Sequence, residues 1–349
     1  MNAVHRIDLP RIVLVGRDVI DSLGDVCSEL GFKRPLIVTG RTTYGIAGKR
    51  AQGILEESGL TVNVTHCKDA HLDTVERVKT LAKEVNADSV VGVGGGRTID
   101  VAKLGATQSG TFFVSVPTTA SHDGIASCSA SIKGMGKPYS MKANSPIAVL
   151  ADSKIIQESP YRFTASGCGD IISKAVSVRD WRLSHEENGE YYGEYAGSLA
   201  LMSSSLVRRN ALIIREGLEE GYRTLLEALV SCGVAMSIAG SSRPCSGSAH
   251  LFSHALDLIA PGKALHGEQC GVGTIMMAKL HDLDWQSIRE SLRLVEAPTT
   301  AEGLGVDEET LVDALVRANE IRPDRYTILN KVTLDRKSAR ELASDCGVL

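Results

Sequence analysis

A β-branched segment runs through three consecutive glycines into a helical pattern in SVVGVGGGRTIDVAKLGA (residues 89–106), where the helix is predicted to start near Arg97. Glycines let an anion approach the backbone closely, and a helix N-terminus offers unpaired N–H groups and a favourable dipole. The unit is therefore a candidate pyrophosphate site. It follows the fourth predicted strand rather than the first and lacks the usual GxGxxG pattern, so a tight turn without a ligand stays open as the alternative.

Five further β-branched runs surround this unit and alternate with helical patterns. Their spacers carry apolar residues at three- and four-residue intervals, as crossover helices on a parallel sheet do. After Pro160 only helical patterns follow. We therefore predict an α/β N-terminal domain with a doubly wound, Rossmann-like parallel sheet (residues 1–157) and an all-α C-terminal domain (residues 158–349), with the active site in the cleft between them. The predicted strands are RIVLV (11–15), PLIVT (35–39), TVNVT (61–65), SVVGV (89–93), TFFVSV (111–116) and PIAVL (146–150).

Composition narrows the class of function. The chain has 349 residues, of which 43% are hydrophobic and 23% charged, as in ordinary globular proteins. A net charge of −4 and an aromatic content of 4% argue against nucleic-acid binding. The N-terminus lacks the apolar core of a signal peptide, and the most apolar stretch, residues 225–240, is too short to span a bilayer and is predicted to be a buried core helix. We expect a cytoplasmic protein without membrane insertion that acts on small molecules.

The eight cysteines show neither CxxC pairs nor the close spacing of a zinc ribbon. They are interpreted as reduced and mostly structural thiols. Cys168 and Cys270 stand beside candidate site residues, and small apolar packing is the favoured role for both.

A second loop, VPTTASHDGIAS (116–127), leaves the next predicted strand and carries hydroxyl groups followed by Asp123. Ligands of open α/β sheets bind at the carboxyl ends of strands, so these hydroxyls are candidates for nucleotide binding and Asp123 for a polar substrate. A turn capped by Asp123 is the alternative. At the end of the second predicted strand, Gly40 and Arg41 stand where an NAD-selective fold often has an acidic residue, so NADP(H) should be accepted as well as NAD(H).

Three histidines are concentrated in SAHLFSHALD (248–257) and ALHGEQCGVGT (264–274). His250 and His254 are four residues apart and share one face of a helix, which Ser246 or Ser248 can cap, and a turn near Gly262 could return His266 to them. Asp170 in SGCGDIISK is predicted to be a buried acid. An Asp/His/His set with an open position suits Zn²⁺ as a Lewis acid, although Fe²⁺ is also compatible and core histidines remain the alternative.

These motifs together resemble archaeal sn-glycerol-1-phosphate dehydrogenase, within the superfamily of glycerol dehydrogenases, iron-type alcohol dehydrogenases and dehydroquinate synthase; DGIAS (123–127) with SGSAHLFSHALD (246–257) is the specific part. The resemblance implies reversible NAD(P)H-dependent reduction of dihydroxyacetone phosphate to sn-glycerol 1-phosphate, which supplies the backbone of archaeal membrane lipids. It also implies one Zn²⁺ per chain, and we expect a homo-oligomer. By resemblance, the metal ligands are Asp170, His250 and His266, and the residues facing the substrate are Asp123, Asp170 and His254. The implied cofactor contacts are Gly96, Arg97, Thr98, Ile99, Asp100, Thr118, Thr119, Ala120, Ser121 and Ser127.

Recognition of the substrate phosphate is not fixed by these motifs. Arg243, Lys263 and Arg325 are candidates, and solvated surface charge is the favoured interpretation of each. Three other functions stay open: a glycerol dehydrogenase, a lyase similar to dehydroquinate synthase, and a nucleotide-binding regulatory protein without a metal.

Overall fold

The computed structural model describes residues 7–133 and 139–349, which divide into two compact units, Met1–Pro160 and Tyr161–Leu349. Residues 1–6, part of the N-terminus in which no signal peptide is expected, lie outside the described residues. Unit 1 alternates strands and helices along the chain. Its strands are β1 (Ile12–Gly16), β2 (Pro35–Thr39), β3 (Asn63–His66), β4 (Ser89–Gly94), β5 (Phe112–Pro117), β6 (Ser129–Ile132), β7 (Tyr139–Lys142) and β8 (Ala148–Asp152). Its helices are η1 (Val19–Ser22), α1 (Leu23–Glu29), α2 (Arg41–Thr43), η2 (Tyr44–Gly48), α3 (Lys49–Glu57), α4 (Leu72–Glu84), α5 (Gly96–Ser109), η3 (Asp123–Ile125) and α6 (Ser153–Gln157).

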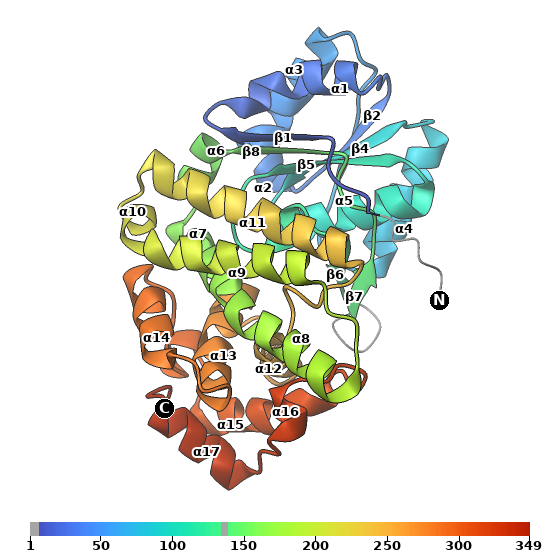
Figure 1. Cartoon of the computed structure of the whole chain (residues 1–349). Helices are drawn as coiled ribbons and strands as arrows, with labels where there is room; N and C mark the ends of the chain where they lie inside the picture. The colour runs from blue at the N-terminus through green and yellow to red at the C-terminus, as the bar shows by residue number, and fades with distance from the viewer. Residues whose placement is uncertain (1–6, 134–138) are drawn as a thin grey trace. The chain divides into compact units, whose positions relative to one another are not determined.

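Six strands of unit 1 form one parallel sheet in the order β1-β8-β5-β4-β2-β3. In its centre, Val91 of β4 lies opposite Ile37 of β2 on one side and Val114 of β5 on the other. All six predicted strands are present, and the predicted parallel sheet is confirmed (Figure 1). The antiparallel hairpin β6-β7 was not predicted, because SASI and YSMK lack the β-branched runs that mark the other strands.

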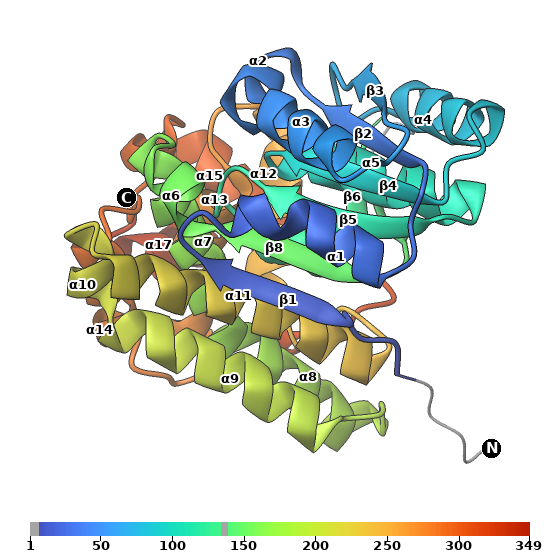
Figure 2. The same ribbon diagram turned by 90° about the horizontal axis from the view of Figure 1, so that it is seen from above.

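Both faces of this sheet are covered, which makes it doubly wound. Ile37, Val91 and Val114 pack on one face with residues of α1 and α3, such as Leu23 and Leu55. The alternate strand positions pack on the other face with α4 and α5. Figure 2 shows the two helical layers on either side of the strands. The carboxyl ends of the strands therefore lie together at one edge, where β4 and β5 lead into the two predicted ligand loops.

Unit 2 is helical, and residues 161–349, all of which the structure describes, contain no strand. The predicted change of structural class after Pro160 is thus confirmed. Its helices are α7 (Tyr161–Ile172), α8 (Lys174–Asn188), α9 (Glu194–Arg209), α10 (Ala211–Arg215), α11 (Glu219–Ala239), α12 (Ser248–Ile259), α13 (His266–Leu280), α14 (Trp285–Leu294), η4 (Glu302–Leu304), α15 (Glu308–Arg317), η5 (Ala318–Glu320), α16 (Ile328–Lys331) and α17 (Arg336–Asp345).

Helix α11 is the one helix among the described residues that is long and apolar enough to cross a membrane, and 67% of its most apolar window is buried inside the protein. The prediction of a buried core helix here is confirmed. The predicted caps of α12 are wrong. Its N-cap is Gly247, and the backbone N–H and hydroxyl of Ser248 both donate to the buried carboxylate of Asp180.

Candidate active site

The glycine loop joins the carboxyl end of β4 to the N-terminus of α5. Packing within the protein leaves no room for a side chain at two of its glycines. A Cβ on Gly96 would lie 2.0 Å from His122 Nε2, and a Cβ on Gly94 would lie 2.7 Å from the Cβ of Thr98. His122, which the sequence analysis missed, is held in place because its Nδ1 accepts a hydrogen bond from the Gly124 N–H at 3.0 Å. The glycine loop and residues 122–124 therefore pack closely against each other.

A buried lysine ties the second loop to α5. Lys103 Nζ donates to the backbone oxygens of Gly124 and Ser129, both at 2.6 Å, and lies 3.3 Å from Asp100 Oδ1. The other carboxylate oxygen of Asp100 accepts from the Ser131 N–H at 3.0 Å. These bonds fix the course of residues 124–131 beside the helix that starts at the glycine loop.

The predicted cofactor residues differ in whether their side chains are available to a nucleotide. The side chains of Ile99 and Ala120 are fully buried, and the Asp100 carboxylate is occupied by its internal bonds, so these three could contact a nucleotide only through their backbone. Thr118 is different, because its buried Oγ1 has no hydrogen-bond partner among the described residues. The remaining predicted residues, Gly96, Arg97, Thr98, Thr119, Ser121 and Ser127, lie in the same two loops and at the start of α5.

In unit 2, close helix packing brings the predicted metal ligands together. Asp170 lies on α7, His250 on α12 and His266 at the start of α13. Helices α7 and α13 approach closely because glycines face each other: a Cβ on Gly267 would lie 1.8 Å from Ser166 O, and a Cβ on Gly169 would lie 2.3 Å from Gly267 O. The glycines of SGCGD and HGEQCG thus set the distance between the carboxylate and His266.

The resulting cluster is compact and almost buried. Ligand atoms of Asp170, His250, His266 and Cys270 all lie within 4.8 Å of one another. Atoms bound to one tetrahedral Zn²⁺ at about 2.0–2.3 Å would be roughly 3.3–3.8 Å apart, so a small contraction would complete the geometry. The donor types and their spacing therefore fit a zinc ion.

Cys270 is the member of this cluster that the sequence analysis missed. Its Sγ lies 3.5 Å from His266 Nε2. The available signal was the spacing of four residues between His266 and Cys270, which places both side chains on one face of α13.

A chain of hydrogen bonds fixes the orientation of His266. Gln269 Nε2 donates to Asp257 Oδ1 at 3.1 Å, and Ser253 Oγ donates its only proton to Gln269 Oε1 at 2.6 Å. Ser253 Oγ must therefore accept at 3.0 Å from His266 Nδ1. This arrangement places the imidazole proton on Nδ1 and leaves the Nε2 lone pair for a metal, as in other ligating histidines.

The charge of Asp170 is balanced by Lys174, a fully buried lysine whose Nζ lies 2.6 Å from Asp170 Oδ1. His250 Nε2 lies 3.4 Å from the same oxygen. Burial by itself would raise the pKa of Asp170, but the charge of Lys174 and the hydrogen bond from His250 outweigh it and hold that pKa well below its usual range. Asp170 is thus a carboxylate, the form that a metal requires.

His254 lies one turn beyond His250 and stacks on His266, with ring centroids 5.8 Å apart. Burial, together with the positive charges of His250, Arg325 and Arg322, lowers the pKa of His254 to about 3. Its Nδ1 has no hydrogen-bond partner among the described residues. His254 is therefore a neutral imidazole that still has an unused ring nitrogen beside the metal cluster.

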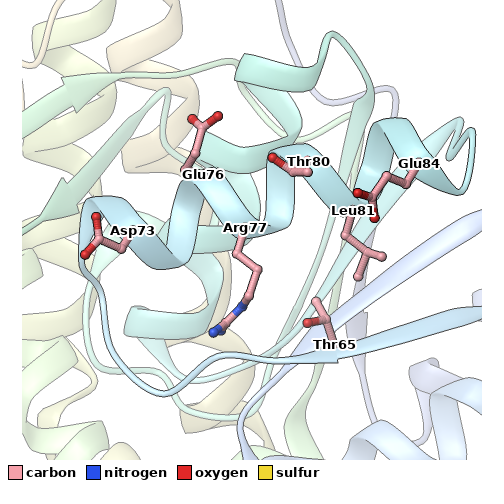
Figure 3. A pocket seen from close by; sticks show the side chains of 7 residues that line it. All are labelled: Thr65, Asp73, Glu76, Arg77, Thr80, Leu81 and Glu84. Atoms are coloured by element: carbon pink, nitrogen blue, oxygen red, sulfur yellow. The ribbon is translucent and has the colours of Figure 1, made fainter.

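Unit 1 also has a surface hollow, whose lining is drawn in Figure 3. No predicted site residue lines it, and two of its charged side chains have local partners: Glu76 pairs with Lys79, and Arg77 donates to His66 O at 2.9 Å. We assign this hollow no function. It is lined by Thr65, Asp73, Glu76, Arg77, Thr80, Leu81 and Glu84.

Known proteins resemble this chain over nearly its whole length. The chain is 50% identical to the glycerol-1-phosphate dehydrogenase [NAD(P)+] of Pyrococcus furiosus, over 99% of this chain and 100% of that protein. It is 52% identical to the enzyme of the same name from Methanosarcina mazei, over 95% and 94% of the two chains. The chain belongs to the glycerol-1-phosphate dehydrogenase family. The resemblance drawn from the motifs is thereby confirmed.

Two coarser comparisons agree with this family. The sequence profile of the iron-containing alcohol dehydrogenases matches residues 14–160. A probable glycerol dehydrogenase from Sinorhizobium meliloti has the same fold, with a TM-score of 0.79, 24% identity and 98% coverage of both chains. The predicted fold class is therefore confirmed for this glycerol-1-phosphate dehydrogenase family member.

Proposed function

We propose that this protein catalyses the reversible reduction of dihydroxyacetone phosphate by NADH or NADPH to sn-glycerol 1-phosphate. The main evidence is that the side chains of Asp170, His250 and His266 meet in one buried cluster. In addition, the chain is 50% identical to a glycerol-1-phosphate dehydrogenase over its full length. In the reaction the ketone carbon receives a hydride, the ketone oxygen receives a proton, and the nicotinamide is oxidised. The product would supply the backbone of membrane lipids.

Asp170, His250 and His266 would hold one Zn²⁺, which as a Lewis acid polarises the ketone and stabilises the forming alkoxide. Neighbouring residues already orient two of these ligands. Lys174 donates a hydrogen bond to Asp170, and the hydrogen-bond chain Ser253–Gln269–Asp257 leaves His266 Nε2 available to the metal. The imidazole and carboxylate donors would also accept Fe²⁺. Zn²⁺ is preferred here because hydride transfer to a ketone needs a Lewis acid and no change in the oxidation state of the metal.

Unit 1 would bind the nucleotide, whose reduced nicotinamide supplies the hydride. The backbone N–H groups at the start of α5 would face the pyrophosphate, and the unpaired Thr118 Oγ1 would donate to the nucleotide. Arg41, exposed after β2, would tolerate a 2′-phosphate, so either cofactor is accepted.

Asp123 and His254 would orient the substrate. His254 is neutral, so it can accept a hydrogen bond at one ring nitrogen and donate at the other, and we assign it to proton transfer toward the alkoxide. Replacement of His254 by Ala should lower kcat by about 10²- to 10⁴-fold while zinc is retained. Near-parental kcat from pH 6 to 9 would remove this role from His254.

The decisive assay measures reduction of dihydroxyacetone phosphate with stereochemical identification of the product, before and after chelation and after restoration of zinc. We expect sn-glycerol 1-phosphate, loss of activity on chelation and its return with Zn²⁺. Absence of turnover with either cofactor would overturn the proposal. Full activity of protein shown by elemental analysis to be free of metal would overturn the role of the cluster.

A glycerol dehydrogenase is the second candidate, because a probable enzyme of that name shares the fold. The ratio of kcat/KM for glycerol 1-phosphate to that for glycerol separates the two, and a ratio near one would favour glycerol. We also propose a cytoplasmic homo-oligomer, which fractionation and light scattering would test.

A further inference from the structure

Two of the phosphate candidates are buried arginines, so their interpretation as solvated surface charge is wrong. Arg243 is 4% exposed and Arg325 is 6% exposed. Arg243 has a carboxylate partner: it forms a forked ion pair with Glu190, and its Nη1 donates to Tyr326 O at 2.8 Å. Arg243 therefore fixes the segment that contains Arg325. Lys263, the third candidate, is exposed.

Arg325 differs because it has no carboxylate partner among the described residues. Its Nη1 donates to Ser246 O and its Nη2 donates to Ser242 Oγ at 2.9 Å. A guanidinium has five N–H donors, so these bonds leave most of its capacity unused. Burial, together with the charges of Arg322 and Arg243, lowers the pKa of Arg325 to about 9, so it remains a cation at neutral pH.

The charges of two nearby carboxylates act on Arg325, but each carboxylate forms its ion pair with another arginine. Glu190 pairs with Arg243, and Asp324 lies 3.0 Å from Arg322. A buried cation that forms no direct ion pair is costly even with these charges nearby, so such a site is suited to an anion from outside the chain.

Arg325 contacts the segment that precedes a helix of the predicted reaction centre in unit 2. Its two acceptors, Ser242 and Ser246, lie in the turn that leads into α12, the helix carrying His250 and His254. The positive charge of Arg325 contributes to the lowered pKa of His254. The cation is therefore bound to the turn immediately before the helix that carries the imidazole expected to face the substrate.

We propose that Arg325 binds the phosphate group of the substrate and makes the enzyme selective for phosphorylated trioses, an inference that rests on the function proposed above. The planar fork of an arginine matches the geometry of two phosphate oxygens. A buried donor set that needs an acceptor also rejects the analogue that lacks one. Dihydroxyacetone should therefore be a poor substrate.

The first test replaces Arg325 with Met, which keeps the length of the side chain, and with Lys, which keeps its charge. The readout is the ratio of kcat/KM for dihydroxyacetone phosphate to that for dihydroxyacetone. We expect about a 10- to 100-fold fall of this ratio in R325M and a smaller fall in R325K. R223M is the matched control, because Arg223 is a surface arginine of α11 paired with Glu227, and its ratio should not change.

The second test uses the unaltered protein loaded with metal and cofactor. Inorganic phosphate should slow hydrogen–deuterium exchange of residues 321–327 and compete with dihydroxyacetone phosphate. This measurement decides the matter if R325M and R325K do not fold. Absence of protection, or an unchanged substrate ratio in folded R325M, would overturn the assignment to Arg325.

The two proposals fail in distinguishable ways. If the unaltered protein does not reduce dihydroxyacetone phosphate, the proposed function is wrong. If it prefers the phosphorylated ketone and folded R325M keeps that preference, only the phosphate assignment is wrong. Loss of the preference in K263A, with R325M unaffected, would move the phosphate site to Lys263.

Discussion

Replacement of Ser253 by Ala should loosen the metal site without removing a ligand. Ser253 Oγ lies 3.0 Å from His266 Nδ1 and 2.6 Å from Gln269 Oε1, and both Ser253 and Gln269 are fully buried. The substitution removes both bonds and leaves the Gln269 oxygen without its donor. It also frees His266 to rotate or to move its proton to Nε2, the atom that should face the metal.

The magnitudes follow from those two losses. Leaving a buried polar group unsatisfied costs about 1–3 kcal/mol, so the free energy of unfolding of the metal-free protein should fall by about that amount. Loss of a bond that orients a ligating histidine typically lowers metal affinity by about 10- to 100-fold. Competition for zinc against a calibrated chelator measures the affinity, and denaturant unfolding of the apoprotein measures stability.

S203A is the matched control. Ser203 is also buried, but its Oγ donates at 3.0 Å to Leu199 O of its own helix, so its loss should leave the zinc affinity unchanged. If folded S253A and S203A bind zinc within twofold of each other, His266 is not oriented by the Ser253–Gln269–Asp257 chain, and the reasoning about its tautomer is refuted.

Three further predictions test other parts of the structure. G267A should unfold about 1–3 kcal/mol more easily and bind zinc more weakly, because its Cβ would lie 1.8 Å from Ser166 O; G53A in α3, with open space around it, should instead gain up to about 1 kcal/mol, and equal stabilities in denaturant would contradict the close approach of α7 and α13. C270A should keep zinc affinity within about threefold, since a catalytic zinc needs only three protein ligands; a loss of two orders of magnitude in chelator competition would indicate a closed, structural site. R41E should raise the KM for NADPH far more than that for NADH, and near-absolute NADH selectivity of the parent enzyme would defeat this idea.

The sequence predicted those features that depend on local pattern. The β-branched runs located all six strands of the sheet, and the alternation with helical spacers predicted that the strands are parallel, although it did not predict their order. The hairpin β6-β7 escaped because its short strands are rich in serine and carry no such pattern. Its position depends instead on long-range bonds, such as that from the Ser131 N–H to Asp100.

The candidate site was only partly predictable, because the missing residues act through distant contacts. Lys103, Lys174 and Arg325 are all buried, whereas lysine and arginine in a sequence are expected at the surface. Each becomes identifiable only when the elements that surround it are packed. Lys174 follows Asp170 by four residues, but that spacing alone does not distinguish an exposed helical pair from a buried one.

The glycines of the nucleotide loop and of the metal-site helices are weaker evidence for a ligand than the clustered donor side chains are. Gly96 makes room for the His122 ring and Gly267 makes room for the backbone of α7, so in both places packing alone already excludes a side chain. A glycine-rich motif therefore does not by itself demonstrate a ligand. The stronger evidence is the convergence of donors that packing does not require, namely Asp170, His250 and His266, together with a buried arginine, Arg325, that forms no ion pair with a carboxylate in the described part of the chain. The internal partners of these groups, such as Lys174 beside Asp170 and Ser253 beside His266, do not account for the convergence of three ligand atoms, and that is why metal affinity and phosphate affinity test the proposals more directly than the fold does.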